Sequence, residues 1–590
     1  MLVEKKVHLK PHVVVQVGQT GYLSSEFYQI AGVVVVRLAK SLDQAQRHYD
    51  VIIVGSGYGG GISASRLARA GKRVAVLERG REFVTGEFPQ RFPDMRNEMR
   101  VTGKRMSLGS EVGLYDVRLG DDMHVLVGCG LGGGSLVNAG VALRPDPRVF
   151  ADACWPGQIR QDGLLDEGFR RARQWLAPSR DPEAEKHTKF QALKQATAGM
   201  EGRAVAPEIA VSFADRISAG GIAQPACTRC GDCCGGCNVG AKNTVALTYL
   251  PDAVRHGAEL FTLAKVSHVA KSDDVWTVHV VNQDQSLPLQ ERNMELSAEM
   301  VILSAGTLGS TEILIRSRDK GLAVSDRIGE RFSANGDIIA FGYGAKIPVK
   351  AIGVGHPVKE GLLPVGASVS GQYEYDSAHN LDEELRVQEG ALPSALAPML
   401  PVMFVPNGRL LGALKSLISG VYEGPLASLQ TFFAVSHDSA SGRLVLQNNA
   451  LMVAWPDAAS EPVYKRMDAV LGEMVENVGG SYVKNPLAGS VMGHQPATAH
   501  PLGGSGMGYE CSDGVVDHKG RVFDRAGRGS TDVHAGLYVI DGSIIPRSLG
   551  VNPLLTISAL SERAMLHMAA DYGFQLDVTP VSEATPLSAR

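Results

Sequence analysis

The chain has 590 residues and a mass of 62.7 kDa, whereas a single hydrophobic core stops growing at roughly 250 to 300 residues. Its 58 basic and 62 acidic residues give a formal net charge of -4, so no overall positive charge attracts a nucleic acid. With 44% hydrophobic and 20% charged residues, the composition also excludes a disordered chain, a collagen and a coiled coil. We therefore expect a folded protein of two or more domains, or of one domain with large insertions, that does not bind nucleic acid.

The first 47 residues precede any clear structural pattern, and we predict that they form an N-terminal extension. Their most apolar stretch, Ile30 to Ala39, is interrupted by Arg37 and is shorter than the roughly 18 apolar residues of a membrane span. The early lysines and the mixed segment after them lack the order of a secretory signal. We expect a cytoplasmic protein in which Phe27 to Leu38 packs on the main body, with peripheral membrane contact as the alternative.

A strand, a glycine turn, a helix and a second strand are predicted next. Asp50–Val54 and Val74–Leu77 are short apolar runs, typical of strands buried on both faces. The helix between them ends near Gly71, a suitable C-cap. Together they form one βαβ unit.

The turn of this unit carries the spacing of a dinucleotide-binding loop. In this motif the first glycine makes the tight turn, the second admits a pyrophosphate and the third packs the helix against the strand. Glu78 ends the second strand, 23 positions after the first glycine, where a carboxylate binds ribose hydroxyls and repels a 2′-phosphate. FAD or NAD is therefore expected rather than NADP, and this unit alone does not decide between them. The loop residues assigned to the cofactor are Gly55, Gly57, Tyr58, Gly59 and Gly60.

Later segments add further elements of the same kind. Met300 to Ala305 and Gly536 to Asp541 read as buried strands. Residues 552–571 read as a helix with Pro553 just inside its start. One doubly wound sheet is thus built from the first quarter, the middle and the last tenth of the chain.

Four separated motifs carry a family resemblance. They are GSGYGGG at 55–61, GCGLGGGSLVNAGV at 128–141, HPLGG at 500–504 and DGSIIPRSLGVNPLLTISAL at 541–560. In this order they resemble the glucose-methanol-choline (GMC) flavoprotein oxidoreductases, and within them the branch similar to cholesterol oxidases. The resemblance spans about residues 48 to 570 and is thin between 345 and 490.

The resemblance implies an α/β fold in which an FAD-binding, Rossmann-like domain carries an inserted α+β substrate domain built on an antiparallel sheet. We predict a discontinuous FAD-binding domain at 48–145, 226–340 and 491–575, a substrate-binding domain at 146–225 and 341–490, an N-terminal extension at 1–47 and a C-terminal tail at 576–590.

The second glycine motif favours FAD, because a backbone without side chains lets a flat flavin approach. No histidine stands in that motif, so we expect FAD to bind without a covalent bond. Asn138 resembles the family's flavin-contacting asparagine, Asp541 its second acidic contact, and Val266 a strand position whose backbone meets adenine. The positions assigned to the cofactor outside the first loop are Glu78, Gly128, Gly133, Gly134, Ser135, Asn138, Val266, Asp541, Asn552 and Pro553.

Oxidation of an alcohol moves a hydride to flavin N5 and a proton from the hydroxyl to a base. His500 in HPLGG and Asn552 in GVNP resemble the family's catalytic pair, with His500 as base and Asn552 orienting the hydroxyl. His494 is a second histidine close in sequence. Cholesterol oxidases also use an acidic residue of the substrate domain that has no match here; His437 and Asp438 are the nearest candidates.

The expected substrate is a hydrophobic alcohol, for which a sterol or a terpenoid is an option. The electron acceptor would be oxygen, a quinone or a redox protein. Two alternatives use the same scaffold: a flavin lyase similar to the fatty acid photodecarboxylases, and an electron-transfer subunit whose working part is a cysteine loop.

That loop is Cys227-x2-Cys230-x2-Cys233-x3-Cys237, the spacing of a bacterial ferredoxin cluster. Asn238 stands where ferredoxins have proline. An iron-sulfur cluster and a metal-free loop that supports the flavin domain are both kept as hypotheses, with zinc as a third. A cluster near the flavin would export single electrons and make the enzyme a dehydrogenase.

Overall fold

The computed structural model describes residues 28–30, 33–35, 37–104, 106–403, 420–484 and 495–581. The chain divides into two compact units, Met1–Arg37 and Leu38–Arg590. In the smaller unit, β1 (Tyr28–Ile30) and β2 (Val33–Val35) pair antiparallel. Part of the segment Phe27 to Leu38 lies outside the described residues, so its packing and its membrane contact stay predictions.

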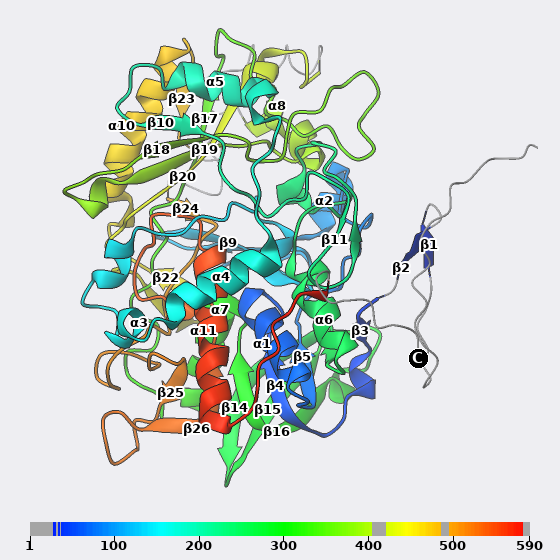
Figure 1. Cartoon of the computed structure of the whole chain (residues 1–590), viewed down its shortest axis with the longest axis vertical. Helices are drawn as coiled ribbons and strands as arrows, with labels where there is room; N and C mark the ends of the chain where they lie inside the picture. The colour runs from blue at the N-terminus through cyan, green and yellow to red at the C-terminus, as the bar shows by residue number, and fades with distance from the viewer. Residues whose placement is uncertain are drawn as a thin grey trace, which may run out of the picture. The chain divides into compact units, whose positions relative to one another are not determined.

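A nine-stranded sheet forms the base of the larger unit (Figure 1). Neighbouring strands run parallel in the order β26-β16-β4-β5-β13-β3. The strands β14 and β15 extend the sheet antiparallel from β16, and β25 pairs antiparallel with β26. The nine strands are β3 (Ala39–Lys40), β4 (His48–Val54), β5 (Val74–Leu77), β13 (Glu259–Phe261), β14 (Ala264–Ser272), β15 (Val275–Asn282), β16 (Asn293–Leu303), β25 (Arg521–Phe523) and β26 (Val533–Val539).

The predicted βαβ unit is the centre of this sheet. The four residues of β5 are all buried, as are the last four of β4, because helices cover both faces of a parallel sheet. The helix α1 (Tyr58–Arg69) connects the two strands and packs against α11 (Leu554–Tyr572), which α4 (Leu164–Leu176) covers in turn (Figure 1). On another side, α7 (Gly306–Asp319) contacts β14.

A six-stranded, wholly antiparallel sheet lies at the opposite end of the larger unit (Figure 1). Its order is β10-β18-β19-β20-β17-β23, and α10 (Pro462–Asn477) and α5 (Thr188–Ala196) pack beside it. The predicted fold class, a doubly wound domain with a second domain on an antiparallel sheet, is therefore confirmed. The strands are β10 (Arg203–Val205), β17 (Ile338–Tyr343), β18 (Gln372–Tyr375), β19 (Leu385–Glu389), β20 (Gln430–Ser436) and β23 (Ser481–Val483).

A five-stranded sheet, in the order β24-β9-β8-β6-β7, completes the cavity walls described below. Its strands are β6 (Met99–Gly103), β7 (Met106–Leu108), β8 (Tyr115–Leu119), β9 (His124–Gly128) and β24 (Ala497–Thr498). Two ribbons are formed by β11 (Arg216–Ile217) with β12 (Ala223–Gln224) and by β21 (Arg443–Gln447) with β22 (Ala450–Ala454). The remaining helices are α2 (Phe92–Asn97), α3 (Gln158–Gln161), α5 (Thr188–Ala196), α6 (Tyr249–Arg255), α8 (Leu400–Met403) and α10 (Pro462–Asn477).

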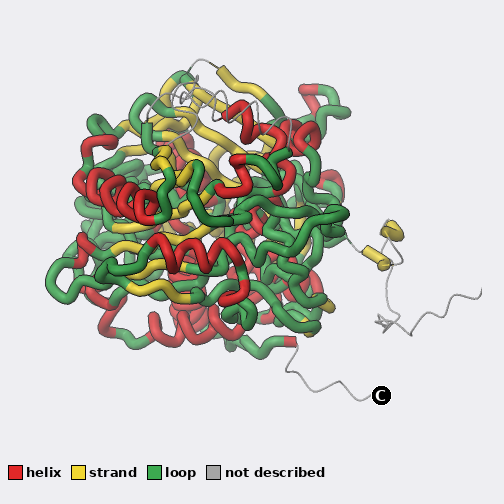
Figure 2. Tube along the Cα trace, turned by 90° about the horizontal axis from the view of Figure 1, so that it is seen from above, coloured by secondary structure: helices red, strands yellow, loops and turns green. Residues whose placement is uncertain are grey.

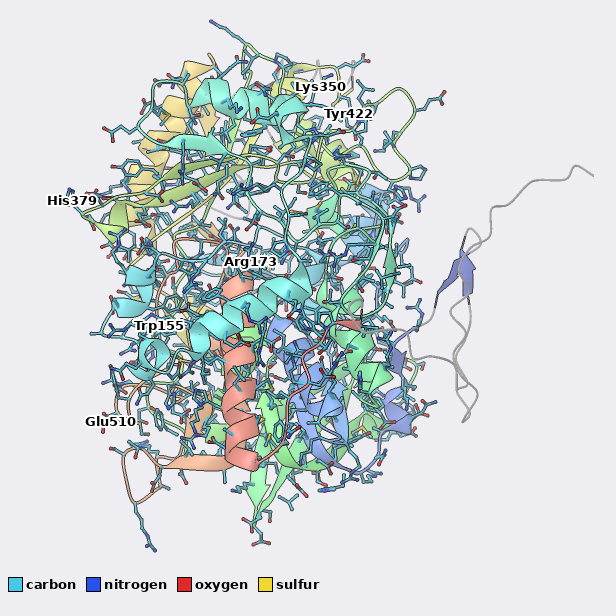
Figure 3. All side chains as sticks on the ribbon, in the orientation of Figure 1. Trp155, Arg173, Lys350, His379, Tyr422 and Glu510 are labelled. Carbon is cyan, nitrogen blue, oxygen red and sulfur yellow. The ribbon has the colours of Figure 1, made fainter. Side chains whose placement is uncertain are left out.

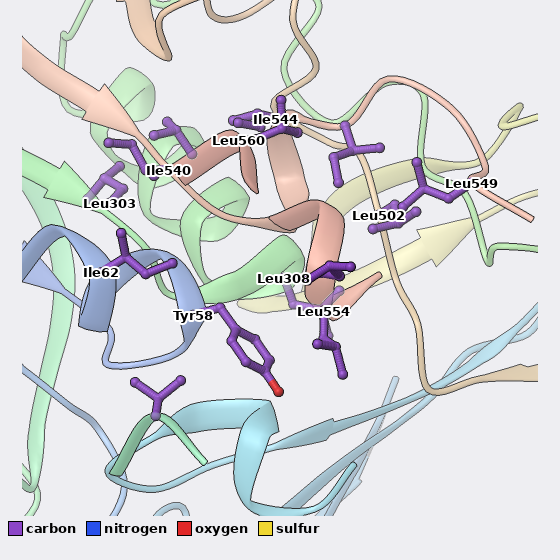
Figure 4. Packing of buried hydrophobic residues seen from close by; sticks show 14 of the residues in the cluster. Tyr58, Ile62, Leu303, Leu308, Leu502, Ile540, Ile544, Leu549, Leu554 and Leu560 are labelled. Carbon is purple, nitrogen blue, oxygen red and sulfur yellow. The ribbon is translucent and has the colours of Figure 1, made fainter. Parts of the chain in front are cut away.

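Loops connect these elements over much of the larger unit (Figure 2). Among the described residues, no helix is both long and apolar enough to cross a membrane. The main hydrophobic core surrounds the nine-stranded sheet and continues to the starts of three helices, where Tyr58, Leu308 and Leu554 gather (Figure 4). These three helix starts are the floor of the candidate site.

Candidate active site

A cavity of about 1740 Å³ is lined by all three large sheets. Pockets for a single small ligand are usually about 300 to 1,000 Å³, so this one has room for a dinucleotide together with a second molecule. The first turns of α1, α7 and α11 line it, so backbone groups at the N-terminal ends of three helices border the same space. Such groups favour phosphates and other anions.

The glycines of the first loop differ in what surrounds them. Gly55 has φ +95, and a Cβ there would lie 2.3 Å from the carbonyl oxygen of Ser304. A Cβ on Gly59 or Gly60 would lie 1.7 Å from Ile540 O and 2.0 Å from Gly55 O, respectively. At Gly57 nothing lies within 4 Å. Three glycines thus pack helix against strand, while Gly57 opens to the cavity, where a pyrophosphate could approach.

The second glycine loop lies directly against the first. A Cβ on Gly133, which has φ +55, would lie 2.8 Å from the Cα of Gly57, whereas Gly134 faces open space. The Nδ2 of Asn138 donates to the Tyr58 hydroxyl at 2.7 Å, and burial raises the pKa of that phenol. Two bare backbone segments therefore form one edge of the cavity.

Glu78 lies at the end of β5, lines the cavity and is buried. Its carboxylate accepts from Ser56 Oγ at 2.6 Å and from the Gly80 N–H at 2.9 Å. Ser56 also accepts from the Gly132 N–H at 2.9 Å, so it joins Glu78 to the second glycine loop. In the sequence, only the place of Ser56 between Gly55 and Gly57 indicates that it belongs to the site.

Asp541 serves the site through its neighbours. Its carboxylate accepts from the N–H of Gly306, the hydroxyl of Ser310 and both the N–H and hydroxyl of Ser543, at 2.5 to 2.9 Å. Burial raises the pKa of this carboxyl. With four donors already bound, Asp541 fixes the start of α7 and the turn Gly542–Ile544, both of which border the cavity.

The other assigned cofactor positions divide into two groups. Gly128, Val266, Asn552 and Pro553 line the cavity, and Pro553 caps α11. Ser135 does not: it is buried behind the loop, where its hydroxyl donates to Gly132 O at 2.6 Å and accepts from the Val245 N–H at 3.0 Å. Ser135 therefore shapes the loop without facing the cavity.

His500 is held by Asp337, a residue for which the sequence suggested no role. The Nδ1 of His500 lies 2.8 Å from Asp337 Oδ1, while Oδ2 accepts from the backbone N–H groups of Ala499 and His500 and from the Thr498 hydroxyl. Because a carboxylate only accepts, Nδ1 carries the ring proton and Nε2 keeps a lone pair. A fixed acceptor therefore faces Asn552.

Asn552 lies just before α11, with its Nδ2 3.4 Å from His500 Nε2. The Gln388 side chain pairs with it reciprocally: Gln388 Nε2 donates to Asn552 Oδ1 at 2.5 Å, and Asn552 Nδ2 donates to Gln388 Oε1 at 3.2 Å. His500, Asn552 and Gln388 all line the cavity. A hydroxyl beside the histidine would therefore meet one acceptor and one donor.

Comparison with protein families agrees with this geometry. Residues 49–335 match the N-terminal GMC oxidoreductase model and residues 465–561 match the C-terminal one. The chain belongs to the GMC oxidoreductase family.

Relatives of this GMC oxidoreductase include three alcohol-oxidising enzymes. It is 27% identical to a cholesterol oxidase of Acinetobacter baumannii, with 89% of this chain and 95% of the relative covered. It is 26% identical to a cholesterol oxidase of Mycobacterium tuberculosis, covering 88% and 90%. It is 25% identical to a long-chain-alcohol oxidase of Arabidopsis thaliana, covering 86% and 66%.

Solved structures share the fold. A pyridoxine 4-oxidase from Mesorbium loti matches with a TM-score of 0.53 and 17% identity, over 88% of this chain and 99% of the other. A fungal aryl-alcohol oxidase matches with a TM-score of 0.55 and 15% identity, over 90% and 100%. GMC oxidoreductases bind FAD, and the helix starts, the open faces of Gly57 and Gly134 and the carboxylate of Glu78 fit that cofactor.

Neither His437 nor Asp438 lines the cavity. Asp438 accepts from Ser333 Oγ and from the Gly336 and Ala440 N–H groups, and burial raises its pKa to about 6. Burial lowers the pKa of His437 to about 3. Among described residues 341–484, no carboxylate lines the cavity. These two candidates for the missing acid were therefore wrong, because their position in sequence did not reveal which way they face.

The cysteine loop packs beside the second glycine loop. Cys234 lines the cavity, while Cys230 and Cys233 are buried in a small apolar cluster that Cys227 and Cys237 adjoin. A single zinc ion with Zn–S bonds of about 2.3 Å needs sulfurs about 3.8 Å apart. No three ligand atoms of this loop, all of whose cysteines are described, lie within 4.8 Å of one another. The arrangement therefore does not fit zinc.

Lys242 connects the two loops. Its ammonium is buried and donates to the backbone oxygens of Leu136, Asn138 and Cys233 at 2.8 to 2.9 Å. Burial lowers the pKa of this amine. The three carbonyls match its three donors, so Lys242 fixes the backbone of Asn138 relative to the cysteine loop.

Proposed function

We propose that this GMC oxidoreductase oxidises the hydroxyl group of a hydrophobic alcohol, with His500 as the base. The observation that carries the proposal is the fixed His500 Nε2 acceptor beside the Asn552 donor, in the same cavity as the two glycine loops. A general base needs its free nitrogen within hydrogen-bond reach of the hydroxyl, and this one is pre-oriented by Asp337.

The FAD, when bound, supplies the acceptor for the hydride of the carbinol carbon. His500 Nε2 takes the hydroxyl proton, and Asp337 then stabilises the imidazolium that results. Asn552 Nδ2 donates to the alcohol oxygen as negative charge builds on it. Glu78, Asn138 and the glycine loops would hold the cofactor, with Asn138 supported by Tyr58.

The substrate side of the cavity favours an apolar molecule. Its walls are mostly aliphatic and aromatic, and a buried polar substrate would leave its own groups without partners there. The substrates named for the related cholesterol oxidases and long-chain-alcohol oxidase support the same class, with a sterol or terpenoid as the finer proposal. The apolar lining residues on this side include Val141, Ile339, Phe341, Leu392, Leu396, Phe433 and Val483.

Oxygen is the proposed electron acceptor, because the related enzymes are named oxidases. A second candidate, a dehydrogenase with an iron-sulfur cluster on the cysteine loop, rests on the place of Cys234 in the cavity wall. Cys227, Cys230, Cys233 and Cys237 would hold such a cluster, which would supply one-electron transfer from the flavin. None of the eight cysteines, all of which are described, forms a disulfide bond, which supports the proposed cytoplasmic location.

The test is anaerobic reduction of the bound flavin by a series of alcohols, followed by its absorbance. We expect bleaching with long-chain or sterol alcohols, and a reduction rate about 10² to 10⁴ times lower in His500→Ala. His518→Ala is the control, because His518 does not line the cavity. Light-dependent turnover of a carboxylic acid that survives His500→Ala would instead favour the lyase, and iron with sulfide in the purified protein would favour the dehydrogenase.

A further inference from the structure

A chain of side-chain amides runs from Asn552 to the edge of the antiparallel sheet. Gln388 Nε2 donates both to Asn552 Oδ1 at 2.5 Å and to Gln372 Oε1 at 2.9 Å. Gln372 Nε2 donates in turn to Glu374 Oε1 at 2.9 Å. The other carboxylate oxygen of Glu374 binds the exposed Arg203. We call Glu374, Gln372 and Gln388 the amide relay.

Strand geometry explains why these residues meet. Gln372 and Glu374 are two positions apart on β18 and share one face. Gln388 on β19 lies directly opposite Gln372 in the antiparallel register. Gln372 and Gln388 are almost completely buried. The connection between the strands reaches the surface, where His379 is labelled in Figure 3.

The relay has a direction because Glu374 can only accept. Its carboxylate attracts the Nε2 of Gln372, which leaves Gln372 Oε1 for Gln388. Gln388 then presents Nε2 to Asn552 Oδ1. Reversing any one amide would place two acceptors or two donors against each other, which costs about 1 to 3 kcal/mol per buried unpaired group.

Asp337 fixes the opposite end in the same sense. It accepts from His500 Nδ1, so Nε2 needs a donor, and Asn552 Nδ2 lies 3.4 Å away. The carboxylates of Asp337 and Glu374 therefore favour the same orientation of the Asn552 amide. Asp337 immediately precedes β17, and Glu374 is in β18.

We propose that the amide relay is a positioning device that keeps the N–H group of Asn552, and not its oxygen, turned toward His500 and the reacting hydroxyl. The inference rests on the proposed alcohol oxidation. A reversed Asn552 would set its oxygen beside His500 Nε2, so the alcohol oxygen would meet two acceptors and lose the donor that stabilises its developing charge.

The rate of anaerobic flavin reduction at saturating alcohol tests the relay. Gln388→Leu removes both partners of the Asn552 amide, and we expect the rate to fall about 10- to 100-fold while alcohol affinity changes about twofold at most. Glu374→Gln keeps the size of the side chain but lets the amides reverse together, and we expect a fall of about threefold or more.

Gln430→Leu is the matched control. Gln430 is buried in the neighbouring strand β20, does not line the cavity, and its Oε1 has no hydrogen-bond partner among the described residues. It should lower the rate no more than about twofold. A loss in Gln430→Leu equal to that in Gln388→Leu would show general damage to the sheet and overturn the relay.

A second readout does not need turnover. In protein labelled with ¹⁵N-histidine, the Nε2 signal absent from His500→Asn identifies His500. Glu374→Gln should shift that signal, because its donor partner is no longer fixed, while Gln430→Leu should not. If no alcohol reduced the flavin of the parent protein, the proposed function would be overturned. The shift of the His500 Nε2 signal in Glu374→Gln would still test the relay. An unmoved signal together with a parental reduction rate in Glu374→Gln would overturn the relay alone.

Discussion

Two regions of the site differ in how far apart their residues lie in sequence. The nucleotide cradle consists of the two glycine loops and Glu78, and the alcohol-side pair consists of His500 and Asn552. Gly55 to Glu78 supply much of the cradle from one βαβ unit, and Ser56 reaches Glu78 over only 22 positions. His500 meets Asp337 over 163 positions and Asn552 over 52, and Asn552 meets Gln388 over 164. The cradle therefore depends on local backbone geometry, whereas the pair depends on how two sheets are placed.

The largest effect is expected where the cradle backbone is most crowded. Gly59→Ala places a Cβ 1.7 Å from Ile540 O, and backbone cannot yield cheaply there, so we expect a loss of about 3 kcal/mol or more in the free energy of unfolding. Urea unfolding measures the stability, and the FAD retained after purification measures cofactor binding. In Gly57→Ala the Cβ enters open space. We expect nearly parental stability with weaker FAD binding; equal destabilisation of both variants would contradict the distinction.

A change beside the alcohol-side pair should slow the reaction while the protein keeps its FAD. Asp337→Asn offers an N–H to His500 Nδ1 or leaves it poorly bound, so Nε2 no longer reliably carries the lone pair. We expect flavin reduction to slow by about 10²-fold or more with FAD binding retained. Stopped-flow absorbance gives the rate, and the flavin spectrum of the purified variant gives the occupancy. Loss of FAD in parallel with the rate would mean that the pair and the cradle are not separable.

The expected effect of replacing Lys242 is intermediate, because this residue supports the nucleotide cradle from a loop distant in sequence. Lys242→Met keeps the apolar stem but leaves three buried carbonyls without their donor, and we expect a loss of about 2 to 3 kcal/mol in stability. FAD affinity should fall as the backbone of Asn138 loosens. Lys186→Met, at an exposed site, is the control and should change neither quantity measurably.

The prediction with the smallest effect on activity concerns the cysteine loop. Burial raises the pKa of the Cys227 thiol to about 12 and of the Cys234 thiol to about 11. Because only the thiolate reacts, alkylation of these two residues at pH 7.5 should be at least about 10²-fold slower in the folded protein than in urea. Peptide mapping after iodoacetamide treatment follows each site. Rapid labelling of the folded protein would show that the loop opens.

The local motifs made the fold and the cofactor chemistry predictable. The βαβ unit, the strand before Asp541 and the last helix appear within about three residues of their predicted bounds, since their hydrophobic runs and glycines act locally. The strand predicted to start at Met300 starts at Asn293. Ser135 was assigned from the same kind of motif but faces away from the cavity. A motif locates a loop, whereas the direction of each side chain depends on the packing around it.

Asp337 and Gln388 could not be assigned a role from sequence, because neither lies in a motif with His500 or Asn552. Asp337 lies outside the four motifs of the resemblance, and Gln388 lies where the resemblance is thin. His437 and Asp438 were considered instead for their polar chemistry, and both turned out to be buried away from the cavity.

By itself the sequence predicted a doubly wound nucleotide fold, a GMC flavoprotein resemblance and the proposed pair of His500 and Asn552. These features depend on residue types and on short spacings between residues, both of which can be read from the sequence. Only the tertiary structure decided which carboxylate holds His500, which amides hold Asn552 and which oxygens bind Lys242. Except for the bond from Lys242 to Cys233, those contacts join strands and loops more than 100 positions apart, and such distances close only when the sheets pack around a common cavity.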